Sequence, residues 1–189
     1  MRRLSDLREQ VSKLEDAEIG ARFTVEPLGT KHNRAAFACG DQALDEYFKT
    51  QASQDIRKNV AAVFVLLDNA QDKIVAGYFA LSAWAVLPSE LPKEVLKKLP
   101  RYERLPATLL GRLAVSKNYQ KQGLGGLLLM KALQQSLAQS REIGSTFVVI
   151  HSKNERGRTF YEKRGFLRLV DQPNSLFLPM ATIEQLDLK

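Results

Sequence analysis

The sequence has little of what metal-based or disulfide chemistry requires. Its 189 residues include one cysteine, Cys39, and two histidines, His32 and His151. One cysteine excludes a disulfide within the chain, and these three side chains are too few for the four ligands of a structural zinc site. We therefore predict no metal. The sequence also lacks a signal peptide and a long apolar run, which predicts a cytoplasmic protein with no membrane association.

Length and charge limit the number of domains and the kind of partner. A hydrophobic content of 44% in 189 residues can fill one substantial core but leaves no room for a second catalytic domain. We predict one domain over 21–189, preceded by an amphipathic helix in residues 1–20. The net charge of +7 favours an anionic partner such as nucleic acid, although a generally basic surface would give the same charge.

Hydrophobic periodicity predicts strands alternating with helices, and hence an α/β fold with a mixed sheet. Helices are expected from an N-cap at Asp41 to about Arg57, from residue 124 onward, and from Asn154 to Arg164, where Gly165 ends the last one. In the first helix, Leu44, Tyr47, Phe48 and Ile56 should face inward. Strands are expected at 22–28, 61–67, 74–84, 109–115, 146–151, 166–170 and 176–180.

A glycine-rich segment joins the strand at 109–115 to the helix that follows it. Gly123, Gly125 and Gly126 lie where that helix begins. The first amides of a helix have no intrahelical partner and lie at its positive dipole end, and glycine leaves out the Cβ atoms that would keep a phosphate away. The segment therefore predicts a cradle for the pyrophosphate of an acyl-CoA, with a purely structural turn before a buried helix as the alternative.

Two motifs carry a family resemblance. The segment Gln120-Lys121-Gln122-Gly123-Leu124-Gly125 resembles motif A, Gln/Arg-x-x-Gly-x-Gly/Ala, of the GNAT superfamily of acyl-CoA N-acyltransferases, and residues 160–166, Phe-Tyr-Glu-Lys-Arg-Gly-Phe, are similar to the block that ends its domain. The resemblance implies a mixed, mostly antiparallel sheet with splayed central strands flanked by helices, and acetyl-CoA as acyl donor. The residues it implies for binding acetyl-CoA are Leu113, Ala114, Val115, Gln120, Lys121, Gln122, Gly123, Leu124, Gly125, Gly126 and Asn154.

The same resemblance implies that Tyr161 is the general acid that protonates the departing thiolate. A phenol with a pKa near 10 is protonated at neutral pH, which suits the role, although aromatic packing alone is the alternative. Residues 109–115 contain no carboxylate where several lysine-acetylating GNATs keep a glutamate; Arg112 is there instead. A lysine amine is only about 0.04% neutral at pH 7, whereas an α-amine is roughly 10 to 15% neutral. A site with no evident base therefore favours an α-amine acceptor.

A closer resemblance covers residues 23–187. The segments 37–40, Phe-Ala-Cys-Gly, 44–48, Leu-Asp-Glu-Tyr-Phe, and 176–180, Leu-Phe-Leu-Pro-Met, resemble GNAT toxins of bacterial toxin-antitoxin pairs. This implies acetylation of the α-amine of aminoacyl-tRNA, which blocks translation, a ribbon-helix-helix antitoxin and a homodimer. Two alternatives stay open: a GNAT enzyme acting on a protein N-terminus or a small-molecule amine, and a non-catalytic nucleic-acid-binding module.

Prolines from Pro88 to Pro106 exclude a long element between the strands at 74–84 and 109–115, so this stretch is predicted to be a surface insertion with one short helix near 94–99. It carries most of the cations that we expect to line a path for the RNA backbone, although each could be an ordinary solvated charge. These residues are Lys93, Lys97, Lys98, Arg101, Arg104 and, beyond the insertion, Arg112.

Two positions call for a separate interpretation. Gly157 stands where the family usually has alanine, at a cost of about 1 kcal/mol in helix propensity. Cys39 has no histidine near it in sequence, so we interpret it as a small buried residue before a helix and not as a nucleophile.

Overall fold

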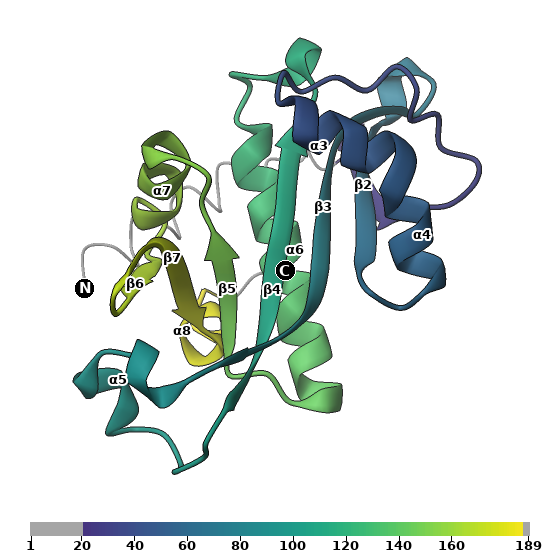
Figure 1. Ribbon diagram of the computed structural model, residues 1–189. Helices are drawn as coiled ribbons and strands as arrows, with labels where there is room; N and C mark the ends of the chain where they lie inside the picture. The colour runs from purple at the N-terminus through teal and green to yellow at the C-terminus, as the bar shows by residue number, and fades with distance from the viewer. Residues whose placement is uncertain (1–20, 187–189) are drawn as a thin grey trace. The chain divides into compact units, whose positions relative to one another are not determined.

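The computed structural model describes residues 21–186, so the predicted helix of residues 1–20 lies outside the described part of the chain (Figure 1). The strands are β1 (Phe23–Pro27), β2 (Ala62–Asp68), β3 (Ile74–Val86), β4 (Leu105–Val115), β5 (Phe147–His151), β6 (Leu167–Leu169) and β7 (Gln172–Pro179). The α-helices are α3 (Gln42–Glu46), α4 (Ala52–Arg57), α5 (Lys93–Leu96), α6 (Leu124–Ile143), α7 (Glu155–Glu162) and α8 (Met180–Glu184). Within residues 21–186, no helix is both long enough and apolar enough to cross a membrane.

Hydrogen bonds link the seven strands in the order β1-β2-β3-β4-β5-β7-β6. The pairs β1–β2, β2–β3, β5–β7 and β6–β7 are antiparallel, whereas β4 and β5 are parallel. This confirms the predicted mixed, mostly antiparallel sheet. The parallel ladder joins Ala107, Thr108 and Leu109 to Phe147, Val148 and Val149. The predicted splay concerns residues beyond this ladder and stays a prediction.

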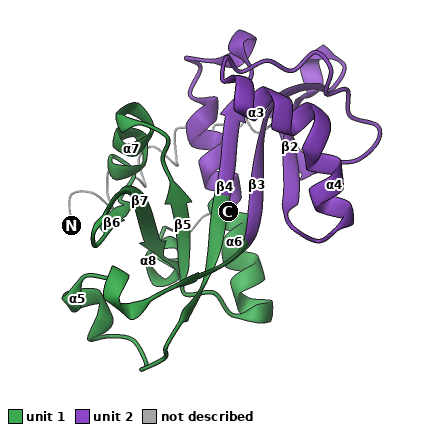
Figure 2. Ribbon diagram, viewed as in Figure 1, with its two compact units in different colours: residues 1–9, 83–110, 133–189 green, residues 10–82, 111–132 purple. Residues whose placement is uncertain are grey.

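The chain divides into two compact units (Figure 2). Of the described residues, unit 1 contains 83–110 and 133–186, and unit 2 contains 21–82 and 111–132.

Unit 2 is built on an aromatic core. The ring of Tyr78, on β3, stacks on Phe48 with 4.4 Å between centroids and meets Phe37 edge-on at 5.4 Å. As predicted, Asp41 caps α3: its side chain accepts from the amides of Ala43 and Leu44 at 3.0 and 3.2 Å. The predicted helix to Arg57 is interrupted, because residues 47–51 form a π-helix, η1 (Tyr47–Gln51). This widened turn buries two consecutive aromatic side chains, Tyr47 and Phe48.

Unit 1 has a separate apolar core around β5. Phe147 and Phe177 meet edge-on at 5.4 Å, and the apolar side of α5 packs against the same cluster through Val95 and Leu96. The insertion thus rests on the core with its apolar residues and leaves its charges outside. The predicted end of α7 is confirmed: Gly165 has a left-handed φ of 83°, and the Phe166 amide donates to the Tyr161 carbonyl at 3.2 Å. The sequence did not predict α8, which begins directly after Pro179.

Candidate active site

The glycine-rich segment forms a tight loop before α6. The backbone turns through left-handed conformations at Lys121 (φ 62°) and Gly123 (φ 81°), and the Gly126 amide donates to the Gly123 carbonyl at 2.8 Å. The main-chain amides of residues 122–125 find no acceptor within the described part of the chain. Free amides at the start of a 20-residue helix are what a pyrophosphate requires, so this loop fits the diphosphate of acetyl-CoA.

Gln120 holds this loop in place through its own side chain. Its Nε2 donates to the carbonyl of Cys39 at 2.7 Å and to the carbonyl of Val115 at 3.0 Å. A second tie lies beside it, where the Lys117 amide donates to the Ala38 carbonyl at 2.8 Å. Gln120 was predicted as a cofactor-binding residue. In the structure its side-chain amide group donates its hydrogen bonds to the protein itself. Lys121 and Gln122 are exposed on the same loop.

The end of β4 lies directly before the loop. Ala114 is buried in the core of unit 2, whereas Leu113 and Val115 are half-buried. The neighbouring strand approaches closely at Gly77, where a Cβ atom would lie 2.8 Å from the Ala114 carbonyl and 2.6 Å from Leu128 Cδ1 on α6. Sequence reasoning missed Gly77. It is the position that lets β3, β4 and α6 pack this closely.

Arg112, also on β4, stacks on an aromatic ring. Its guanidinium carbon lies 3.6 Å from the centroid of Tyr47. Burial, followed by the nearby Asp55 carboxylate, raises the pKa of Tyr47 to about 12, while the charge of Arg112 acts in the opposite direction. The Tyr47 hydroxyl is buried without a hydrogen-bond partner in the described chain. Arg112 has no acidic partner among the described residues either, so stacking orients a cation whose donors stay available.

Cys39 is less buried than the sequence predicted, but it is not set up as a nucleophile. It is half-buried before α3, its amide donates to Asp45 Oδ1 at 2.7 Å, and burial raises the pKa of its thiol to about 11. A thiol with a raised pKa is a poor nucleophile at neutral pH.

Tyr161, the predicted general acid, lies on α7 in unit 1. Its ring meets Phe160 at 5.0 Å and Phe166 at 5.4 Å, both edge-on. Burial raises the pKa of Tyr161 to about 12, and the charge of Arg164 opposes this shift. The hydroxyl is therefore protonated throughout the physiological pH range and has no hydrogen-bond partner among residues 21–186. Aromatic packing fixes the ring, and the proton remains available for donation.

Asn154 is the N-cap of α7, as predicted. Its Oδ1 accepts from the Gly157 amide at 2.9 Å. The structure also explains Gly157, because a Cβ there would lie 2.7 Å from Ser152 Oγ, which itself donates to the Asn154 carbonyl at 2.7 Å. Two short side chains, those of Ser152 and Asn154, thus close the turn that begins α7, and the predicted contact of Asn154 with the cofactor stays a prediction.

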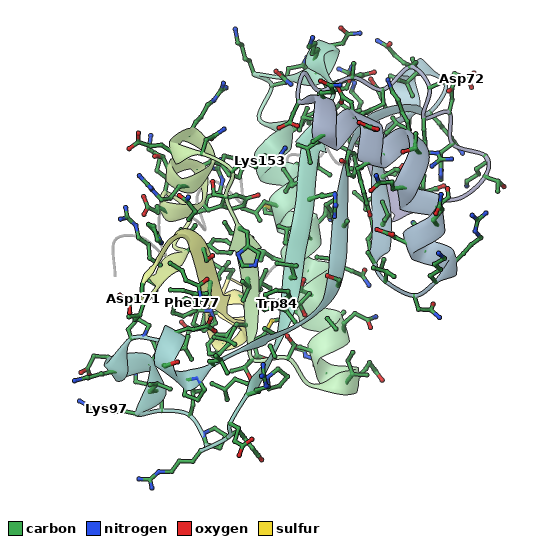
Figure 3. All side chains as sticks on the ribbon, viewed as in Figure 1. Asp72, Trp84, Lys97, Lys153, Asp171 and Phe177 are labelled. Carbon is green, nitrogen blue, oxygen red and sulfur yellow. The ribbon has the colours of Figure 1, made fainter. Side chains whose placement is uncertain are left out.

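The cations of the insertion are all exposed. Lys97 forms an ion pair with Glu94 at 3.1 Å and projects outward from α5 in Figure 3. The other four have no acidic partner in the described part of the chain: Lys93, Lys98, Arg101 and Arg104. These five residues belong to unit 1 and Arg112 belongs to unit 2.

Sequence reasoning assigned no role to Trp84 and His151, whose rings meet in unit 1 with 5.3 Å between centroids. The available signal was that Trp84 is the only tryptophan and lies just before the basic insertion.

Comparison with known proteins decides the family. The family model described as the acetyltransferase (GNAT) domain matches residues 59–168. The chain belongs to this GNAT family. Among curated GNAT relatives, a protein of Sinorhizobium fredii described as "Probable toxin TacT" is 28% identical over 174 residues, which are 88% of this chain and 96% of that protein.

Two solved structures show the same similarity. The toxin AtaT complexed with acetyl-methionyl-tRNAfMet is 31% identical, with a TM-score of 0.80, covering 87% of this chain and 98% of that one. A mutant AtaT bound to the C-terminus of the antitoxin AtaR and acetyl-CoA is 26% identical, with a TM-score of 0.74, covering 89% and 99%. This GNAT chain is therefore homologous to toxins of toxin–antitoxin systems, one of which is solved with an acetylated methionyl-tRNA and, as a mutant, with acetyl-CoA.

Proposed function

We propose that this protein is a toxin that transfers the acetyl group of acetyl-CoA to the α-amine of an aminoacyl-tRNA and thereby blocks translation. The observation that carries the proposal is the similarity to AtaT with its acetylated tRNA, at 31% identity over nearly all of that chain. An acetylated α-amine cannot attack a peptidyl ester, so the modified tRNA cannot accept a growing chain.

The donor is held mainly by the main chain. The free amides of residues 122–125 bind the diphosphate, and the left-handed turn at Gly123 keeps side chains away from it. Gln120 fixes the loop to the end of β4, whose residues Leu113 to Val115 offer main-chain groups to the pantetheine arm. Acetyl-CoA supplies the activated thioester. Asn154, the N-cap of α7 in unit 1, is a further proposed acetyl-CoA-binding residue.

Tyr161 supplies the proton that the leaving group needs. The amine nitrogen bonds to the acetyl carbon, the carbon–sulfur bond breaks, and the thiolate takes the proton of the Tyr161 hydroxyl. Water restores that proton and removes one from the new amide nitrogen. With its pKa raised to about 12, the Tyr161 hydroxyl is still protonated around pH 8, where about half of the acceptor α-amine is neutral.

The acceptor is bound through its charge. Four cations of the insertion have no acidic partner among the described residues and can therefore contact phosphates without first losing an ion pair. Arg112, oriented by Tyr47, extends the same role to β4. The absence of a carboxylate in β4 agrees with an α-amine acceptor, which loses its proton to water.

The partners follow from the same relatives. AtaT binds the C-terminus of an antitoxin, and we propose a ribbon-helix-helix antitoxin and a homodimer for this chain. The exposed basic insertion suits an acidic or amphipathic antitoxin tail. We place the protein in the cytoplasm, because charged tRNA and acetyl-CoA are both there.

The test is to incubate the enzyme with radiolabelled acetyl-CoA and either charged or deacylated tRNA. Label should enter RNA only when the tRNA is charged, and base hydrolysis should release it as N-acetyl amino acid. A Tyr161→Phe preparation is the matched control for contaminating activity. Label on a peptide N-terminus or on polyamines, with none on charged tRNA, would overturn the proposal in favour of an ordinary GNAT enzyme.

A further inference from the structure

Trp84 is placed unusually for a large apolar side chain. It lies near the end of β3, beyond Leu81, the last residue of β3 that pairs with β2, and 44% of its surface is exposed. Its ring meets the ring of His151 at the end of β5, with 5.3 Å between centroids and 71° between planes. An edge-on neighbour fixes a ring without covering its whole face. The two side chains thus make a rigid aromatic corner that is open to solvent.

His151 is held in that corner by its neighbours. Its Nδ1 lies 2.8 Å from the Oγ of Ser175, which is buried on β7 and is the β-sheet partner of His151. Burial lowers the pKa of His151, against the opposing charge of Glu90, so the ring is neutral at pH 7. A neutral, oriented imidazole beside an indole offers aromatic surface and not a second cation.

The corner adjoins the basic insertion within unit 1. Trp84 lies two residues before Val86, where β3 ends and the insertion begins. The insertion is fixed at that point by Glu90, whose carbonyl accepts from the Val170 amide at 2.7 Å and whose carboxylate accepts from Gln172. Four cations without acidic partners in the described chain follow within 14 residues of Glu90. Open aromatic faces beside a basic segment are the combination that binds single-stranded RNA.

Resting on the proposed function, we propose that Trp84, oriented by His151, stacks on the unpaired 3′-terminal base of the charged tRNA. The aminoacyl group is an ester of that terminal nucleotide, so its base is the one nearest to the reacting amine. Stacking tolerates any base and needs no hydrogen-bond donors. This agrees with the aromatic corner, which is formed by the rings of Trp84 and His151. Trp84 is thus a substrate-positioning residue that acts on the acceptor and not on acetyl-CoA.

The test uses two RNA minihelices charged with methionine, one ending in CCA and one in which the terminal nucleotide is abasic. For the wild-type enzyme, removal of the base should lower kcat/KM by about 5- to 150-fold, the range for stacking of one base. Trp84→Ala should lower kcat/KM by a similar factor on the intact minihelix. For this variant, removal of the base should lower kcat/KM little further. Trp84→Phe should keep most of the activity, and the KM for acetyl-CoA should stay unchanged in both variants.

A second measurement does not depend on turnover. Because Trp84 is the only tryptophan, its fluorescence reports this corner alone. Titration with the uncharged CCA-ended minihelix should quench the wild-type signal, and the abasic minihelix should quench it far less. Ile143→Ala, at an 80% exposed apolar side chain elsewhere in unit 1, controls for general loss of apolar surface.

Three results would overturn the proposal: equal quenching by both minihelices, full activity of Trp84→Ala on the intact minihelix, or an equal cost of base removal in wild type and Trp84→Ala. A loss that follows the identity of the charged amino acid instead of the base would assign Trp84 to the amino-acid side chain. None of these results touches the proposed function, which fails only if the wild-type enzyme acetylates no charged tRNA.

Discussion

The two units use their polar side chains in opposite ways. In unit 2 the fully buried carboxylate of Asp68 accepts from Arg22 at 2.8 Å, from the Tyr119 hydroxyl at 3.0 Å and from the Ala70 amide at 3.0 Å. In unit 1 the cations of the insertion are exposed, and four have no acidic partner among the residues described. The buried carboxylate of unit 2 is fully used within the fold, whereas the insertion of unit 1 carries charge that the fold does not use.

This difference indicates that one set of polar residues stabilises the fold and another set is available to bind a ligand. Buried polar groups stabilise a fold only when their hydrogen bonds are complete, as they are around Asp68. Exposed charges contribute little to stability, so they can be kept for a ligand without cost to the fold. Changes around Asp68 should therefore alter stability, whereas changes to the cations of the insertion should alter binding of the acceptor.

The largest effect should come from Tyr161→Phe. Loss of the hydroxyl should lower kcat about 10²- to 10³-fold, because general acid catalysis contributes factors of that order. The dissociation constant of acetyl-CoA, measured by calorimetry, should stay unchanged, since the ring and its packing are retained. Turnover at the wild-type rate would remove Tyr161 from the mechanism.

Asp68→Asn should lower the free energy of unfolding by about 2 kcal/mol, below the range for a fully buried ion pair because 42% of the Arg22 side chain is exposed. The Arg22 guanidinium is the main cause that lowers the pKa of Asp68 in the folded protein. The Asp68 carboxylate therefore stabilises the folded protein fully above its pKa in the unfolded chain, near 3.9. This stabilisation is lost as the pH falls through the lower pKa that Asp68 has in the folded protein.

Urea unfolding of wild type and Asp68→Asn at several pH values measures this difference. The gap between the two proteins should be full at pH 6 and should shrink below pH 4. A gap that does not change with pH would show that the carboxylate charge contributes nothing.

Gln120→Ala should weaken acetyl-CoA binding roughly 5-fold, about 1 kcal/mol, because the loop loses the bridge between Cys39 and Val115. Gln122→Ala is the matched control, since it keeps the main-chain amide proposed to bind the diphosphate and removes a side chain that donates only within its own turn, to the Asn118 carbonyl at 3.1 Å. Calorimetric titration with acetyl-CoA measures both. An equal loss in the two variants would contradict a positioning role specific to Gln120.

The smallest effect concerns the start of α7. Gly157→Ala alone should change stability by less than about 0.5 kcal/mol, because the gain in helix propensity is offset by the contact with Ser152 Oγ. In a Ser152→Ala background the same substitution should stabilise the protein by about 0.5–1 kcal/mol. Thermal unfolding of the four proteins in this double-mutant cycle measures the coupling, and additive effects would show that the contact costs nothing.

The sequence predicted the parts of the molecule that depend on local order. Asp41 and Asn154 cap helices where the pattern placed them, and the loop around Gly123 adopts the predicted turn before α6. The sequence predicted correctly that Tyr47 and Phe48 both face inward, but it did not predict the π-helical turn, η1, in which these two consecutive side chains are buried.

The missed features of the site depend on contacts between distant parts of the chain. Gly77 is required by Leu128 and the Ala114 carbonyl, and Trp84 meets His151 only because β3 and β5 belong to one sheet. Gln120 was assigned to the correct loop, but the direction of its side chain depends on Cys39, which is 81 residues away. Pairings of this kind are fixed by the fold and leave no periodic signal.

The crowding at Gly77 has a consequence for variation at that position. Even alanine would place its methyl group against a backbone oxygen, which cannot swing aside as a side-chain tip can. A saturation library at residue 77 should therefore return glycine alone among active clones, and a smaller side chain at 128 should not widen the choice, since the obstacle on β4 is the main chain itself.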